Sequence, residues 1–222
     1  MKIGIDCRLY GPKHTGIGRY VQNLVEELLK MDSSNEYVLF VGKDFQVQSS
    51  KACPELAEGF KVQSESFKLK VVETDISHYS LKEQFLLPLI IEREKVDIMH
   101  FPLFNVPVLY KGKYVVTIHD LIKHSSRGTG TTTRSPCLYW LKYLGYKFVF
   151  RQAVKRAEKI ITPSRFMKGE IVKEYGVNPN KIVVTYEGVD TKIKNQKSKI
   201  KNKTKNSKLL EQYKIKKPYL LY

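Results

Sequence analysis

The chain has 222 residues, of which 42% are hydrophobic, and a formal net charge of +17. It is long enough for one large domain with its own core. No apolar run approaches the roughly 18 residues of a membrane-spanning helix, and Asp6 interrupts the apolar stretch that a secretory signal needs. Three scattered cysteines (Cys7, Cys53 and Cys137) argue against a disulfide framework and a zinc site, and indicate unpaired thiols in a reducing cytoplasm.

The predicted elements alternate between strands and helices along the chain. Short apolar runs are typical of buried strands, and apolar residues at i, i+3, i+4 spacing indicate helices. The predicted strands cover residues 2–7, 37–41, 96–101, 114–118, 159–162 and 181–184, with weaker candidates at Val62 and 69–72. The predicted helices cover residues 17–30, 80–95, 136–157 and 164–175. We expect Ser164 to cap the last helix and Pro88 to kink or break the second.

This alternation predicts an α/β fold with a Rossmann-like, doubly wound and mostly parallel sheet, covered by helices on both faces. Ligands bind such sheets beyond the carboxyl ends of the strands. Polar residues that directly follow a strand are therefore the first candidates for a site.

The positive charge is concentrated near the end of the chain. Residues 190–222 hold eleven lysines against Asp190 and Glu211, which is about half of the net charge. We predict a domain over 1–190, a lysine-rich linker over 191–208, and the start of a further, absent domain over 209–222. The lysines are either a solvated stretch or a patch for anionic lipid or nucleic acid. Their confinement to one stretch argues against a folded face for specific nucleic acid.

The first candidate site is the loop from Gly11 to Tyr20, which follows the first strand and opens the first helix. Glycines at Gly16 and Gly18 let backbone amides approach a ligand, and a helix N-terminus suits a phosphate. The loop does not match the dinucleotide-binding fingerprint, because Val21 stands where the third glycine belongs. The same pattern is compatible with a tight turn and a helix cap alone.

Two histidines also follow strands. His119 and Asp120 come after residues 114–118, where the histidine can donate a hydrogen bond to a sugar hydroxyl or a phosphate oxygen. Asp120 could fix the tautomer of the histidine or accept sugar hydroxyls. His100 lies at the end of the strand before, where it binds a ligand or only caps the strand. A structural role for each is the alternative.

Taken in order, five segments resemble the N-terminal domain of the family 4 retaining glycosyltransferases. They are residues 2–8, 15–20, 117–121, 161–166 and 186–190. The resemblance implies the GT-B fold, in which two Rossmann-like domains face each other across the active cleft. The C-terminal domain of that fold holds most of the sugar nucleotide, and the N-terminal domain supplies the acceptor site. The turn at Glu187 departs from the asparagine of the family pattern.

The resemblance also implies roles for individual residues. Gly16, Gly18 and Arg19 would face the donor diphosphate, and His119 would face the transferred sugar with Asp120 beside it. Further substrate contacts are expected at Arg8, Lys13, His100 and Arg165. The substrates would be a sugar nucleotide and a glycan or lipid-linked acceptor, with no metal or other cofactor. Stabilisation of the departing diphosphate would carry much of the catalysis.

The paired glutamates and nucleotide-base pocket of the family's C-terminal domain are absent from the 222 residues. We therefore expect a hexosyltransferase half with little activity by itself, which is a truncated gene product, a fragment, or a half that works with a donor domain in trans. Its expected location is the cytoplasm, with peripheral contact to the anionic inner face of the membrane. The alternative is a non-catalytic Rossmann-like binding module. The aromatic-rich helix around 138–144 fits either a membrane interface or a core or interdomain position.

Overall fold

The computed structural model describes residues 1–43, 45, 69–122 and 136–188, with the side chains of 136–139 excepted. The strands are β1 (Lys2–Cys7), β2 (Glu36–Gly42), β3 (Leu69–Thr74), β4 (Ile98–Phe101), β5 (Tyr114–Thr117), β6 (Lys159–Thr162) and β7 (Ile182–Val184). The α-helices are α1 (Thr15–Met31), α3 (Leu81–Arg93), α5 (Pro136–Arg156) and α6 (Arg165–Tyr175). Two short 3₁₀ helices are η1 (Pro12–His14) and η3 (Pro179–Lys181). The elements expected at Val62 and beyond residue 190 lie outside the described residues.

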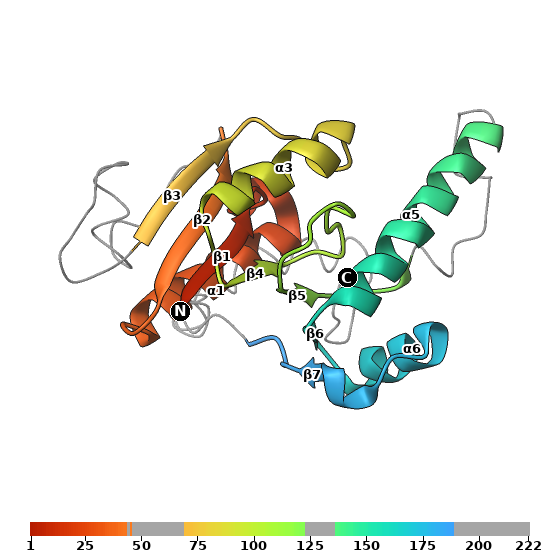
Figure 1. Cartoon of the computed structure of the whole chain (residues 1–222). Coiled ribbons are helices and arrows are strands. Elements are labelled where there is room, and N and C mark those ends of the chain that lie inside the picture. Colours follow the sequence, from red (N-terminus) through yellow and green to blue (C-terminus); the bar gives the residue numbers. More distant parts are fainter. Residues whose placement is uncertain (44, 46–68, 123–135, 189–222) are drawn as a thin grey trace, which may run out of the picture. The chain divides into compact units, whose positions relative to one another are not determined.

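The seven strands form one sheet in the order β3-β2-β1-β4-β5-β6-β7, and every neighbouring pair is parallel. The prediction of a doubly wound, Rossmann-like sheet is confirmed. The chain moves outward from β1 to β3, crosses back to β4 beside β1, and then moves outward in the other direction (Figure 1). The winding direction therefore changes between β1 and β4, where such sheets bind ligands.

Helices cover both faces of the sheet. On one face, α1 buries Val21, Val25 and Leu29 against β1 and β2. On the other face, α3, α5 and α6 pack on the central and later strands through a second cluster, which includes Leu87 of α3 and Phe150 of α5. Successive residues of β2 point into opposite clusters, as expected for a strand that is covered on both sides.

Pro88 does not break α3. The helix begins after Ser80, whose hydroxyl accepts a hydrogen bond from the amide of Glu83, and it continues to Arg93. A proline inside a helix costs about 3 kcal/mol through its missing amide and its ring. Leu87 and Ile91 flank it and are fully buried in the core, so tertiary packing offsets that cost. Of the kink or break expected at Pro88, the break was wrong for this reason.

The cap predicted for α6 is confirmed. The Ser164 hydroxyl accepts a hydrogen bond from the Met167 amide at 3.1 Å, and Gly176 ends the helix in the left-handed conformation, with φ at 62°.

The chain divides into the unit Met1–Tyr186, which holds the sheet, and the unit Glu187–Tyr222. Among the described residues, no helix has the length and apolar character needed to cross a membrane. Cys7 is buried and free.

Candidate functional site

The segments that follow β1, β4 and β5 all begin at the carboxyl edge of the sheet. They lie on either side of the point where the winding reverses. The first is the turn into α1, the second begins at Pro102, and the third holds His119. Parallel strands put these segments at the same edge. The three motifs that the sequence singled out therefore lie at one edge of one sheet.

The turn into α1 is tightly built. Gly11 has a φ of 97°, the amide of His14 bonds to the Gly11 carbonyl at 3.2 Å, and Thr15 opens α1 with a φ of 57°. A positive φ at a β-branched residue is an outlier that costs roughly 1–3 kcal/mol and is typical of functional loops. The N-cap of α1, His14, makes no side-chain capping bond. The first amides of α1 thus suit an anionic ligand.

Gly16 and Gly18 differ in what surrounds them. A Cβ on Gly18 would overlap the carbonyl oxygen of Gly11 and lie 2.8 Å from the Cβ of His14, so only glycine fits. A Cβ on Gly16 would meet nothing within 4 Å. Gly18 therefore serves the packing of the loop, whereas Gly16 leaves open space at the exposed first turn of the helix.

A hydroxyl at the end of β5 links two of the three segments. Thr117 Oγ1 lies 2.9 Å from His100 Nε2 and 3.2 Å from the hydroxyl of Tyr20 on α1. Because a threonine hydroxyl has one proton and two lone pairs, it donates to at most one of these partners and accepts from the other or from both. The side chains of α1, β4 and β5 are in this way tied together beside the turn into α1.

His119 lies next to this group. Its Nε2 is 3.0 Å from the carbonyl oxygen of Pro102, and its ring meets the ring of Tyr20 edge to face at 4.7 Å. A carbonyl only accepts, so Nε2 carries a proton. Asp120 is exposed, and its Oδ1 accepts the amide of Ile122 at 3.0 Å. The Pro102 carbonyl thus fixes the proton on Nε2, and a role for Asp120 toward the tautomer stays a prediction.

Two partly buried histidines are held neutral. Burial, followed by the nearby charge of His119, lowers the pKa of His100 to about 4. Burial likewise lowers the pKa of His78 to about 4, although the carboxylate of Asp6 opposes the shift. At neutral pH, His100 therefore bonds to Thr117 as an uncharged imidazole.

Arg8 lies inside the protein. Its guanidinium donates to both oxygens of Asp6, at 2.8 and 2.7 Å, to Glu83 at 2.6 Å and to the Ile76 carbonyl at 3.2 Å. The side chains of Arg8 and Glu83 are 2% and 0% exposed. Because protein groups take its donors, Arg8 serves to join β1 to α3. The substrate contact expected of Arg8 stays a prediction without support from this geometry.

The other predicted site residues lie at the surface. Lys13 and Arg19 are exposed around the turn into α1, and Arg165 is exposed as the first residue of α6. In the described part of the chain, no three His, Cys, Asp or Glu side chains are grouped so that they could hold a metal.

Sequence reasoning missed Tyr20 and Thr117 as members of the site. Tyr20 lies four residues after Gly16, hence one helical turn away, and Thr117 is the polar last residue of an otherwise apolar strand. Both were visible within the motifs. What the sequence did not contain is the contact between α1 and β5 that makes them partners.

Comparison with known proteins shows the family of the chain and a similar fold. The model of the family described as Glycosyltransferase Family 4 matches residues 14–193. Sucrose-phosphate synthase from Thermosynechococcus elongatus has a similar fold, with a TM-score of 0.55 and 12% identity over 87% of this chain and 49% of its own. A glycosyltransferase from Rickettsia africae ESF-5 is matched at a TM-score of 0.39 and 15% identity, over 97% of this chain and 50% of its own.

The chain thus spans about half the length of these two proteins. No curated protein gives a significant sequence match. The family model covers well over half of the chain, from the turn into α1 to beyond β7. The chain belongs to Glycosyltransferase Family 4.

Proposed function

We propose that this chain is the acceptor-side half of a hexosyltransferase, which moves a hexose from a sugar nucleotide to a glycan or lipid-linked acceptor with retention. Membership of the family supports the transfer of a sugar. One observation carries the proposal: the ring of His119 contacts the ring of Tyr20 on α1, the helix whose first turn is open at Gly16. This contact lies where the winding of the sheet reverses.

The turn into α1 would face the donor diphosphate. The amides of its first turn, reached over Gly16, together with Lys13 and Arg19, would offset negative charge that grows on the diphosphate. In the transfer, the bond from the sugar C1 to the diphosphate oxygen breaks, and the acceptor hydroxyl oxygen bonds to C1. The hydroxyl proton leaves with the departing diphosphate. This half of the site therefore acts by electrostatic stabilisation and needs no metal.

His119 would contact the transferred sugar. The hydrogen bond from its Nε2 to Pro102 and the edge contact with Tyr20 fix the ring orientation. Preorganised side chains of this kind contribute more than mobile ones, because no reorganisation accompanies the reaction. The exposed carboxylate of Asp120 would accept sugar hydroxyls, and Arg165 and His100 would complete the substrate contacts from neighbouring strand ends.

A donor-binding domain would have to join this half. Because the chain spans about half of the two solved relatives, we propose that most of the sugar nucleotide binds elsewhere, on a domain in trans or on more of the same polypeptide. The 222 residues would then turn over little by themselves. The proposed place of action is the cytoplasm or the inner face of the membrane.

The test is complementation. The chain is assayed alone and together with the C-terminal half of a family 4 enzyme, with UDP-glucose or GDP-mannose and a total lipid extract as acceptor source. Release of nucleoside diphosphate and transfer of labelled hexose only in the combined sample is the expected result, with retention read from the anomeric proton of the product. Robust turnover by the isolated chain would refute the half-enzyme. Failure of every combination, with binding retained, would favour a non-catalytic binding module.

A further inference from the structure

The outward face of α5 exposes large apolar side chains. The helix packs on the sheet through its C-terminal part, where Phe150 and Val154 are fully buried. Leu141, Leu144 and Phe148 point away from that core and are 67%, 62% and 53% exposed. Single exposed leucines are ordinary, but a set of three large apolar side chains on one helix marks an interaction surface.

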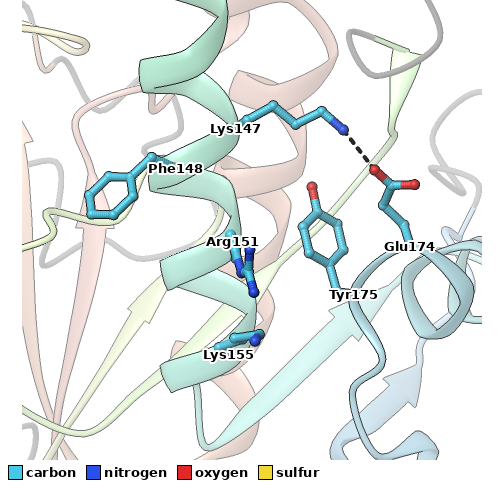
Figure 2. Close-up of a pocket in the computed structure, with 6 residues that line it drawn as sticks. All are labelled: Lys147, Phe148, Arg151, Lys155, Glu174 and Tyr175. Atoms are coloured by element: carbon cyan, nitrogen blue, oxygen red, sulfur yellow. Dashed lines mark hydrogen bonds and ion pairs between the residues drawn. The ribbon is translucent and has the colours of Figure 1, made fainter.

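The same helix is strongly cationic. Residues 140–156 contain five lysines and arginines and no acidic residue. A groove of about 460 Å³ runs between α5 and α6, and three of its lining residues are the cations Lys147, Arg151 and Lys155 (Figure 2). Lys147 leans across to Glu174, 2.6 Å away, while Arg151 and Lys155 form no ion pair among the described residues. The groove therefore carries net positive charge.

The apolar and cationic side chains share one face. Positions 144, 148, 151 and 155 follow helical spacing, so they form a single stripe along α5. The side chains along that stripe are apolar at Leu144 and Phe148 and cationic at Arg151 and Lys155. In Figure 2, Phe148 points to the opposite side of α5 from Glu174, and Arg151 and Lys155 lie further along the helix.

We propose that this face of α5 docks on an anionic lipid bilayer. Leu141, Leu144 and Phe148 would enter the boundary between headgroups and acyl chains, and Arg151 and Lys155 would bind lipid phosphates in the groove. A helix that combines large apolar residues with lysine and arginine is suited to such an interface. The inference goes beyond the proposed transfer reaction and does not depend on it.

Charge favours a bilayer over the other occupants of an apolar face. A second copy of the chain would bring the same cations against this surface, and like charges repel. The outward side of α3 exposes Leu81, Phe85 and Leu89 on the same side of the sheet. Its exposed charges are mixed, with Lys82 and Arg93 against Glu92, so α3 lacks the large excess of positive charge that selects an anionic surface.

The only tryptophan of the chain reports on this face directly. Trp140 lies in α5, one residue before Leu141. We expect its fluorescence to shift to the blue when the full chain is mixed with phosphatidylglycerol vesicles, and to be quenched by brominated acyl chains. Vesicles of phosphatidylcholine should cause neither change. A lysine-rich stretch that bound the vesicles alone would leave Trp140 unchanged, and that result would overturn the proposal.

Charge variants test the groove. Arg151→Glu/Lys155→Glu should weaken binding to phosphatidylglycerol vesicles by more than about tenfold, since each basic residue near such a surface contributes to attraction. The control Lys82→Glu/Lys95→Glu alters the net charge equally at exposed positions on α3 and in the turn after it, and should bind nearly as wild type. Equal losses in both variants would show non-specific attraction and contradict the proposal.

Apolar variants test the stripe. Leu141→Asn/Leu144→Asn should abolish quenching by brominated lipid, whereas Phe85→Asn/Leu89→Asn on α3 should keep it. Equal loss in both would contradict the assignment to α5.

Inorganic pyrophosphate separates a headgroup site from a site for a free anion. Saturable pyrophosphate binding without any vesicle binding would replace the docking surface by a simple anion site.

Discussion

The Arg8 guanidinium lies 2.6 Å from Glu83 Oε1, across 75 positions of sequence, and both side chains are buried. The same guanidinium holds both oxygens of Asp6. Burial raises the pKa of Asp6, but the charge and hydrogen bonds of Arg8 outweigh it and hold that pKa below its usual value. Burial dominates at Glu83 and raises its pKa, even though Arg8 and Asn105 oppose the shift.

We predict that Arg8→Met destabilises the protein by about 3–5 kcal/mol, because two carboxylates would remain buried without their partner. Glu83→Gln should cost less, about 1–3 kcal/mol, since Arg8 then keeps Asp6. Urea unfolding at pH 7 measures both. A loss below about 1 kcal/mol for Arg8→Met would mean that the cluster contributes little to stability.

Stability should depend on pH through two histidines. The pKa of His78 and that of His100 are about 4 in the folded protein, against 6.5 for a free histidine. Between these values the unfolded chain binds protons that the folded chain does not, so the free energy of unfolding rises with pH. We expect a fall of about 1.4 kcal/mol per pH unit for each histidine as the pH drops from about 6.5 toward 4.

The measurement is urea unfolding at several pH values in that interval. His78→Gln and His100→Gln should each flatten the slope by about one proton. An unchanged slope in both variants would contradict the low folded-state pKa values. Below about pH 4, protonation of Asp6 adds a further loss, because its folded-state pKa is depressed.

Gly16 and Gly18 form a matched pair on the first turn of α1. Gly18→Ala should destabilise the chain by about 1–3 kcal/mol, because its Cβ would overlap the Gly11 carbonyl and force backbone to move. Gly16→Ala has room and should be neutral or stabilise by up to about 1 kcal/mol. Thermal unfolding measures the stability of both variants. Equal unfolding midpoints would show that the packing around Gly18 is looser than in the structure.

Thr117 should matter through its hydroxyl alone. Thr117→Val leaves the partly buried imidazole of His100 and the Tyr20 hydroxyl without this partner, at a cost of about 1–3 kcal/mol. Thr117→Ser keeps the hydroxyl and should cost less. In a double-mutant cycle with Tyr20→Phe, the two losses should not add, because both remove the same hydrogen bond. Strict additivity would contradict a direct link between Tyr20 and Thr117.

The sheet was predictable because its strands are short apolar runs separated by amphipathic helices. The start of β4 was not predictable. The prediction began this strand at residue 96 and so included Asp97, whereas β4 begins at Ile98. The carboxylate of Asp97 accepts the Lys2 amide at 2.7 Å before β4 begins. Strand ends follow such pairings between distant segments, and these leave no periodic signal in the sequence.

Within the site, sequence predicted the edge but not the partners. His100 pairs in register with Val115, two residues before Thr117, so His100 and Thr117 project from the same face of the sheet. That register, and the rotation of α1 that brings Tyr20 to the same place, arise only in the folded chain. The partner of Arg8 was not predicted either. The sequence led us to expect a substrate contact, whereas the structure pairs Arg8 with Glu83.

The last prediction concerns the proton on His119. Because Nε2 donates to the Pro102 carbonyl, ¹⁵N NMR should find His119 with its proton on Nε2 at neutral pH. His119→Gln retains an amide donor of similar reach, whereas His119→Ala retains none. In the transferase completed with a donor half, His119→Ala should lower kcat by about 10²–10³ if the ring stabilises charge in the transition state.

The comparison of the two variants separates catalysis from folding. His119→Gln should keep more of kcat than His119→Ala, while both keep the unfolding midpoint of the parent chain. His78 is a partly buried histidine outside the group of Tyr20 and Thr117, so His78→Gln should leave kcat unchanged. If His119→Ala lowers only the unfolding midpoint and kcat is preserved at a temperature where the variant is folded, then the ring is a structural support for the Pro102 segment. The contact with the transferred sugar would then have to come from another side chain at this edge of the sheet.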